Sequence, residues 1–344
     1  MRTKRPKLDI KNGRVELTHG GGGRAMSQLI DELFRPAFSN PALDQLADYA
    51  SLTGGKRIVM ATDAHVISPL FFPGGNIGSL SVHGTVNDVA MSGARPLYLS
   101  AAFILEEGYP LSQLKEIVTA MAEAANHAGV AIVTGDTKVV ERGKGDGVFI
   151  TTTGVGIVEH DLSLGADQIR PGDKVLVSGT IGDHGVAVMS LRQGLSFATD
   201  IVSDSASLHM LTQAAIESVS GLRVLRDPTR GGVAATLNEL AEASGFGIRL
   251  SEAAIPIRPE VNGACELLGL DPLNVANEGK LIAICAPDDA DALLATMKAD
   301  PLGRDSAIIG EVIEDPHHFV QMTTALGGSR IVDWLSGEQL PRIC

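Results

Sequence analysis

The sequence is poor in cysteine and in aromatic residues. Its three cysteines, Cys265, Cys285 and Cys344, have no Cys-x-x-Cys spacing, which argues against a disulfide framework and a zinc site. Aromatic residues make up only 4 % of the chain, and the formal net charge is −13. Nucleic-acid binding uses basic charge and aromatic stacking surfaces, so we expect no nucleic-acid partner.

Long apolar runs are also missing. No stretch approaches the roughly 20 apolar residues of a membrane-spanning helix. Charged and polar residues interrupt positions 8–17, where a secretory signal would have its apolar core. We therefore expect a cytoplasmic protein that does not span a membrane.

The patterns that are present predict an α/β (α+β) fold with two domains. A chain of 344 residues exceeds the size at which a single hydrophobic core usually stops growing. Apolar runs typical of strands, at 97–105 and 148–158, alternate with helical spacing at 112–129. We expect four parts: a glycine-loop segment and helix at 1–45, a first domain at 46–165, a second domain at 166–333 and a flexible tail at 334–344.

Four consecutive glycines stand before a helical pattern that begins near Met26: Gly20, Gly21, Gly22 and Gly23. The backbone N–H groups of such a loop, together with the start of the following helix, can bind phosphate. The segment HGGGG matches neither GxxxxGKS/T nor GxGxxG, so a phosphate-binding loop and a plain connecting loop both stay open.

Four aspartates follow apolar segments, at positions where the sequence predicts turns: Asp63, Asp88, Asp136 and Asp227. Each alone is typical of a cap or turn residue. Together they offer the carboxylate oxygens that Mg²⁺ prefers, usually shared with nucleotide phosphates and water. As a set, they predict a site for a divalent cation and phosphate.

Two further side chains are candidates for chemistry. Lys138 follows Asp136 by two residues and would bring an ammonium group that neutralises charge on a transferring phosphoryl group. Glu278, in a predicted loop with the sequence NEGK, is a candidate general base. A solvated surface side chain is the alternative for both residues.

Cys344 differs from the other two cysteines in its position. Cys265 and Cys285 lie in apolar stretches, where a free cysteine is typically a small buried residue. Cys344 is the last residue of the sequence and ends the stretch LSGEQLPRIC, which can extend to roughly 33–36 Å. We expect a frayed tail whose thiol can visit more than one site, or else a last residue without a role.

Seven segments, in this order, carry a resemblance to a known family: HGGGGRAM, TDAHVISPLFFPGGNIG, NDVAMSGA, GDTKVV, DPTRGG, NEGK and the final PRIC. From His19 onward the chain resembles the hydrogenase maturation factors of the HypE family. Most of these segments are shared with the wider PurM superfamily of aminoimidazole ribonucleotide and selenophosphate synthetases, whereas PRIC is specific to HypE proteins.

The resemblance implies a PurM-like fold of two α/β domains, in which strands of the N-terminal domain form a β-barrel at a homodimer interface. It implies that ATP binds between subunit halves with Mg²⁺, and that the glycine loop, the four aspartates and Thr137 hold them. It also implies a reaction on Cys344. The thiol receives a carbamoyl group from the carbamoyltransferase HypF, and ATP-dependent dehydration turns that group into a thiocyanate.

In the same resemblance, Lys138 stabilises the phosphorylated intermediate and Glu278 takes a proton. The cyanide then passes to the HypC–HypD complex for the iron of nickel-iron hydrogenase. Two other functions stay open. A selenophosphate synthetase usually carries a cysteine or selenocysteine near its glycine loop, whereas no cysteine precedes Cys265 here. A non-catalytic nucleotide-binding scaffold would use Cys344 only for docking.

Overall fold

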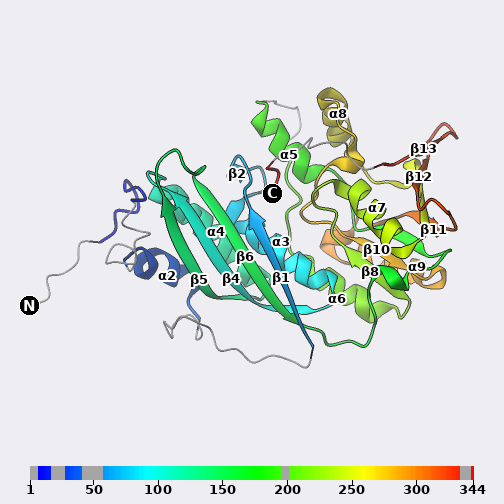
Figure 1. Ribbon diagram of the computed structural model, residues 1–344, viewed down its shortest axis with the longest axis horizontal. Coiled ribbons are helices and arrows are strands. Elements are labelled where there is room, and N and C mark those ends of the chain that lie inside the picture. The colour runs from blue at the N-terminus through cyan, green and yellow to red at the C-terminus, as the bar shows by residue number, and fades with distance from the viewer. Residues whose placement is uncertain (1–6, 17–27, 41–56, 195–200, 334–341) are drawn as a thin grey trace, which may run out of the picture.

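Two large β-sheets with flanking helices make up the molecule (Figure 1). The computed structural model describes residues 7–16, 28–40, 57–194, 201–333 and 342–344. The predicted mixed α/β architecture is confirmed. The four glycines Gly20 to Gly23 lie outside the described residues.

The first sheet has four strands in the order β1-β6-β4-β5. β4 and β5 run parallel, and the other neighbouring strands run antiparallel. Helices α3 (Ile77–Met91) and α4 (Leu111–His127) pack on one face of this sheet. The strands are β1 (Ile58–His65), β4 (Arg95–Glu106), β5 (Ala131–Val140) and β6 (Val148–Ile157).

Side-chain alternation and helix capping explain these elements. β6 alternates between buried and half-buried residues, as expected for a strand with one face on a core. In α4, the apolar residues that repeat with helical spacing from Leu114 to Met121 are buried. α3 begins after Asn76, whose Oδ1 accepts hydrogen bonds from the N–H groups of Gly78 (2.8 Å) and Ser79 (3.3 Å).

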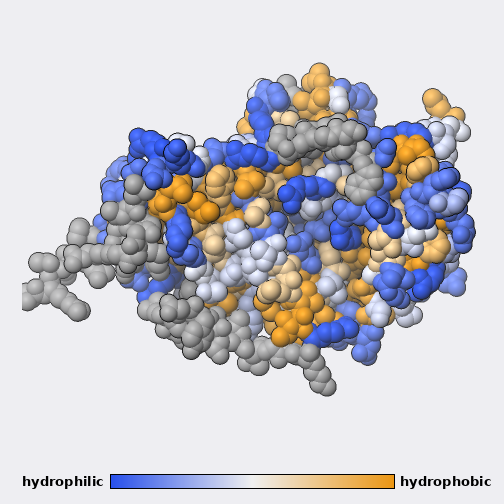
Figure 2. Space-filling model, viewed as in Figure 1, coloured by the Kyte–Doolittle hydropathy of each residue, from blue (hydrophilic) through white to orange (hydrophobic). Residues whose placement is uncertain are grey.

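The opposite face of the four-stranded sheet is open. Ile58, Met60 and Ile104 are 58 %, 70 % and 43 % exposed, and Figure 2 shows apolar and weakly polar residues over this part of the surface. β1 and β5 are the edge strands, so the described part of the chain forms an open sheet rather than a closed barrel. The β-barrel implied by the resemblance would form between two copies of the chain, and it stays a prediction.

The second sheet has seven strands in the order β13-β12-β9-β11-β7-β10-β8. Only β12 and β9 are parallel neighbours. One face packs against α7 (Gly232–Ser244), and the other packs against α6 (His209–Ser218) and α9 (Ala290–Ala299). The strands are β7 (Lys174–Val177), β8 (Leu222–Arg226), β9 (Gly247–Ser251), β10 (Ile282–Cys285), β11 (Ala307–Ile313), β12 (Val320–Thr323) and β13 (Ser329–Ile331).

Two helices, α5 (Asp183–Arg192) and α8 (Pro259–Leu268), pack against each other beside the second sheet. The described part of the chain contains no helix with both the length and the apolar character needed to cross a bilayer. The remaining short elements are η2 (Ile30–Phe34), α2 (Arg35–Phe38), β2 (Phe71–Phe72), β3 (Gly75–Asn76), η4 (Ala166–Gln168), η5 (Glu252–Ala254), η6 (Pro272–Asn274), η7 (Pro287–Asp289) and η8 (Pro301–Gly303).

Three of the four predicted turns are wrong. Asp63 lies inside β1, Asp88 inside α3 and Asp136 inside β5, whereas Asp227 directly follows β8 as expected. At β5 the misleading signal was Gly135. A Cβ at this position would lie 2.2 Å from the backbone oxygen of the neighbouring strand, so the glycine permits close approach within a sheet and does not mark a turn.

Candidate functional site

Three of the predicted aspartates interact where α3 and β1 meet the end of β8. Burial, together with the charges of Asp227 and Asp63, raises the pKa of Asp88 to about 7. Burial also raises the pKa of Asp227 to about 6, and Oδ2 of Asp227 is buried without a hydrogen-bond partner. Carboxylates that repel one another in this way are suited to binding a cation.

Asp63 is oriented by His65, two residues later on β1. Nε2 of the buried His65 lies 3.2 Å from Oδ2 of Asp63. Both side chains approach Gly84 of α3, where an added Cβ would lie 3.0 Å from Nε2 of His65. Burial raises the pKa of Asp63, but His65 and the backbone N–H of Ala64 outweigh it, so the pKa lies below its ordinary value. Asp63 therefore ionises more readily than its two neighbours.

Glu278 lies in the loop segment NEGK, and contacts of each residue in that segment help to hold it in place. The carboxylate of Asp204 accepts hydrogen bonds from the N–H of Glu278 (3.1 Å) and from the ammonium group of Lys280 (3.0 Å). At Gly279 a Cβ would lie 1.8 Å from the backbone oxygen of Asp204, so only glycine fits. Asn277 is buried and makes hydrogen bonds to three backbone groups. These contacts hold the backbone of Glu278 in place.

The carboxyl group of Glu278 is almost completely buried. The residue is 3 % exposed, and its Oε1 has no hydrogen-bond partner. Burial, followed by the charges of Asp204, Asp227, Asp63 and Asp88, raises the pKa of Glu278 well above its ordinary value. The buried site therefore favours the protonated form of Glu278 more than water does, and its carboxylate, once formed, is a stronger base than an ordinary glutamate. Its predicted loop position is confirmed.

The last three residues of the sequence are docked against this site. The N–H of Val66 donates to the carbonyl oxygen of Cys344 (3.1 Å), and the N–H of Ser68 donates to that of Arg342 (3.2 Å), so the two segments run antiparallel. Ile343 is 2 % exposed and packs in the first core. These three residues are docked against the core, whereas the predicted mobility of the tail stays a prediction. Residues 334–341 of the predicted tail lie outside the described residues.

The thiol of Cys344 belongs to the carboxylate cluster. Burial, then the charge of Glu278, raises the pKa of Cys344 far above its ordinary value, with Asp63 adding and Arg230 opposing. The docked sulfur is therefore a neutral thiol and a poor nucleophile. Cys265 and Cys285 are buried as expected, and burial raises their pKa values to about 11 and about 12.

Asp136 and Lys138 do not join this cluster within one chain. Nζ of Lys138 lies 2.8 Å from Oδ2 of Asp136, and both side chains are more than half exposed. Successive side chains of a strand point to opposite faces, so these two lie on the open face of the sheet and Thr137 faces the helices. The strand register puts Asp63 on the same face as Thr137. The predicted set of four aspartates is therefore split into three and one.

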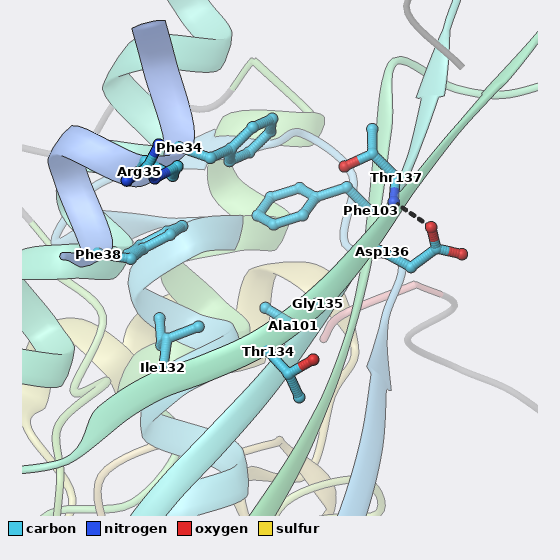
Figure 3. A pocket seen from close by; sticks show the side chains of 10 residues that line it. All are labelled: Phe34, Arg35, Phe38, Ala101, Phe103, Ile132, Thr134, Gly135, Asp136 and Thr137. Carbon is cyan, nitrogen blue, oxygen red and sulfur yellow. Dashed lines mark hydrogen bonds between the residues drawn. The ribbon is translucent and has the colours of Figure 1, made fainter. Parts of the chain in front are cut away.

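A small cavity lies beside β5 (Figure 3). Figure 3 shows the rings of Phe34, Phe38 and Phe103 turned toward one another, while the carboxylate of Asp136 points away from them. The cavity volume is about 120 Å³, below the roughly 300–1,000 Å³ of typical small-molecule sites. Although Asp136 and Thr137 line it, the cavity as described is too small for a nucleotide.

Sequence reasoning missed three residues of the site. His65 and Arg230 stand inside the quoted segments TDAH and DPTRGG, and the charge of Arg230 acts on Asp63, Asp88 and Cys344. Their presence in those segments was the available signal. Asp204 offered no signal, because it lies 74 positions before the residue that it holds.

Comparison with known protein families gives two matches along the chain. The N-terminal domain of AIR synthase related proteins matches residues 46–158, and the C-terminal domain of the same proteins matches residues 170–323. A relative from Cupriavidus necator, named carbamoyl dehydratase HypE, is 66 % identical over 339 residues. The alignment covers 98 % of this chain and 97 % of the relative.

Two crystal structures are similar over nearly their whole length. One, described as hydrogenase maturation protein HypE in complex with ATP, has a TM-score of 0.93 at 50 % identity and covers 96 % of this chain and 99 % of that one. The other, a HypE–HypF complex, has a TM-score of 0.79 at 48 % identity and covers 89 % of this chain and 99 % of that one.

Proposed function

This chain belongs to the HypE family of carbamoyl dehydratases, and we propose that it uses ATP to dehydrate a carbamoyl group carried on its own Cys344. The product is a thiocyanate on the same sulfur. The observation that carries the proposal is the docking of Cys344 beside Glu278 and Asp63. A similar protein in complex with ATP supports the choice of nucleotide.

The chemistry requires a better leaving group than a carbamoyl oxygen. Transfer of the terminal phosphoryl group of ATP to that oxygen supplies one, and loss of phosphate and of the nitrogen-bound protons then leaves a C≡N bond. The thiocarbamate and ATP thus become thiocyanate, ADP and phosphate. Glu278 takes a proton from the nitrogen, and a carboxylate whose pKa is raised is a stronger base than an ordinary glutamate.

Asp63, Asp88 and Asp227 fit Mg²⁺. The buried, unpartnered Oδ2 of Asp227 and the raised pKa of Asp88 are the features that a divalent cation would satisfy. Among the described residues, no group of three or more His, Cys, Asp or Glu side chains is arranged to hold a metal alone. Mg²⁺ held by these carboxylates would therefore complete its coordination with phosphate and water, and it would neutralise charge on the phosphoryl group.

A homodimer formed through the open sheet face accounts for the separated residues. That face exposes Met60 and Ile104 and also carries Asp136 and Lys138. A second copy packed on it gives the predicted barrel and brings Asp136 and Lys138 to the subunit interface. There Lys138 stabilises the phosphorylated intermediate, while Thr137 and the glycine loop complete the ATP site.

HypF is the proposed carbamoyl donor, since a similar protein forms a complex with HypF. The HypC–HypD complex is the proposed acceptor of the cyanide, for the iron of nickel-iron hydrogenase. The relatives' description as hydrogenase maturation proteins supports this place in the sequence of reactions.

Mass spectrometry of the C-terminal peptide tests the proposal. With HypF, its carbamoyl donor and ATP, the wild-type peptide first gains one carbamoyl group and then loses one water. Cys344→Ala shows neither change, and Glu278→Gln stops at the carbamoylated peptide. Cys265→Ala, a matched control at a buried thiol, follows the wild type. ATP turnover that is equal in wild type and Cys344→Ala would reject the self-modifying enzyme in favour of a nucleotide-binding scaffold.

A further inference from the structure

Helix α5 carries two side chains that contact the backbone of the docked segment 342–344. Nε2 of His184 lies 2.8 Å from the carbonyl oxygen of Ile343. Nη2 of Arg192 donates to the carbonyl oxygen of Arg342 at 2.9 Å. His184 stands at the start of α5 and Arg192 at its end, about two helical turns apart, so both project from one face of the helix.

The two hydrogen-bond partners of His184 determine which of its ring nitrogens carries the proton. Oγ of Ser203 accepts the N–H of Ser205 (3.1 Å) and lies 2.8 Å from Nδ1 of His184. The carbonyl oxygen of Ile343 can only accept, so Nε2 of the neutral ring carries the proton and Nδ1 accepts from the hydroxyl of Ser203. Burial lowers the pKa of His184, which keeps the ring in this neutral form.

Arg192 contacts both of the paired segments, 66–68 and 342–344. Besides Arg342, it donates from Nε and Nη2 to the carbonyl oxygen of Ser68, the Nε contact being 3.0 Å. The guanidinium group thus bridges a carbonyl of the tail and a carbonyl of the segment that the tail pairs with. Hydrogen bonds from a charged donor are stronger than those between neutral groups, so this bridge contributes strongly to holding the tail.

We propose that His184 and Arg192 are positioning residues for the dehydration step. They hold the tail against 66–68 and thereby keep the sulfur of Cys344 beside Glu278. Both residues bind backbone carbonyls, so they hold the tail in the same way whether the sulfur carries a proton, a carbamoyl group or a cyano group. The inference rests on the proposed function, because it assigns a purpose to the docked position.

The variants separate the hydrogen bonds from the packing. His184→Leu and Arg192→Met each remove the donor and keep most of the side-chain volume. His184→Gln keeps an N–H donor near the position of Nε2. Leu191→Ala is the matched control, because Leu191 lies on the same helix but is 47 % exposed. Circular dichroism and the thermal midpoint of each variant establish that it is folded.

The first measurement is the alkylation rate of Cys344 without nucleotide, followed by mass spectrometry of the C-terminal peptide. The buried Cys265 and Cys285 serve as internal references. We expect alkylation of Cys344 to become about tenfold faster in His184→Leu and Arg192→Met, because each loses a hydrogen bond that holds the tail, buried at His184 and part-buried at Arg192. His184→Gln and Leu191→Ala stay close to the wild type.

The second measurement is the single-turnover dehydration of protein already loaded by HypF. We expect the rate to fall about tenfold in His184→Leu and Arg192→Met, while loading by HypF is as fast as in the wild type or faster. A merely structural role would slow both steps together. Rescue of dehydration in His184→Gln supports the assigned hydrogen bond.

Two results would overturn the inference. Unchanged alkylation in both donor-free variants means that α5 does not hold the tail. Faster alkylation with normal dehydration means that the docked position is not the reactive one. A wild type that forms no thiocyanate would instead reject the proposed function and the catalytic part of this inference with it, and the alkylation rates would still decide whether α5 holds the tail.

Discussion

The carboxylate of Asp204 lies 3.0 Å from the ammonium group of Lys280, and the two side chains are only 4 % and 11 % exposed. The same carboxylate accepts the backbone N–H of Glu278. One ion pair therefore fixes both ends of the Glu278–Lys280 turn. The position of the candidate base therefore depends on a buried pair of charges.

Removing one partner of this buried pair should destabilise the protein strongly. We expect Lys280→Met to lower the free energy of unfolding by about 3–5 kcal/mol, because it leaves Asp204 buried without its counter-charge. The measurement is urea denaturation. The control is Arg95→Met at the ion pair between Arg95 and Glu159, whose side chains are about half exposed, where the loss should be below about 1 kcal/mol. Equal losses at the two sites would contradict the assigned burial.

Gly279 should not tolerate a side chain. In Gly279→Ala the new Cβ meets the backbone oxygen of Asp204, so we expect the loop to shift, dehydration to fall at least about tenfold and the thermal midpoint to drop. Gly263→Ala is the matched control, because a Cβ at Gly263 of α8 meets nothing within 4 Å. This control should be neutral or stabilising by up to about 1 kcal/mol.

The stability of the protein without nucleotide should depend on pH through Glu278. The folded state raises the pKa of this group above 4.5, so above that pH the folded protein binds more protons than the unfolded chain. Stability therefore falls as the pH rises toward the folded pKa. Relative to Glu278→Gln, the wild type should lose about 1.4 kcal/mol in its free energy of unfolding for each pH unit between the unfolded and the folded pKa of Glu278. Urea denaturation of both proteins at about pH 5 and about pH 8 measures the difference, and parallel pH profiles would refute it.

A charge on the open sheet face should separate the proposed dimer. Met60 is 70 % exposed in one chain, and burying an unpaired ammonium group at its position in an interface is costly. We expect Met60→Lys to sediment as a monomer in analytical ultracentrifugation. Leu267→Lys is the control, since Leu267 is equally exposed, at 67 %, but lies on α8. A wild type that is already monomeric would reject the dimer.

If Lys138 acts across the interface, two inactive variants should complement each other. Lys138→Ala and Cys344→Ala each fail alone, but subunits mixed after mild dissociation form heterodimers in which an intact Lys138 faces an intact Cys344. We expect thiocyanate to reappear on the Cys344-containing subunits. Its absence in a preparation shown to contain heterodimers would place Lys138 and Cys344 of the same chain together.

The sequence predicted the elements that have regular patterns. The helix near 112–129 and the strands near 97–105 and 148–158 were recognisable because one face of each is buried. The spacing of apolar residues therefore indicates which face of each element packs on the core. The turn at Asp136 was predicted wrongly because glycine allows a turn and a close strand contact equally well, and only the neighbouring strand distinguishes them.

The site was less predictable because its parts are distant in sequence. The quoted segments named Asp63, Asp88, Asp227, Glu278 and Cys344 individually, but their association depends on how α3, β1 and the end of β8 pack. The separation of Asp136 from the other aspartates follows from strand alternation, and it is visible only once the register of β5 is known. The docking of the tail had no signal beyond the apolar side chain of Ile343.

That side chain also affects how often the neighbouring thiol of Cys344 leaves its docked position. Exposing a buried isoleucine costs about 1.5–3 kcal/mol, so the side chain of Ile343 raises the ratio of docked to undocked molecules by a factor of roughly 10–100, in addition to the hydrogen bonds that hold the tail. A carbamoyl donor that reacts only with the undocked form sees its apparent affinity reduced by the same factor. The hydrophobicity of a residue that takes no part in the chemistry thus contributes, together with the hydrogen bonds from α5, to how much reactive thiol is available.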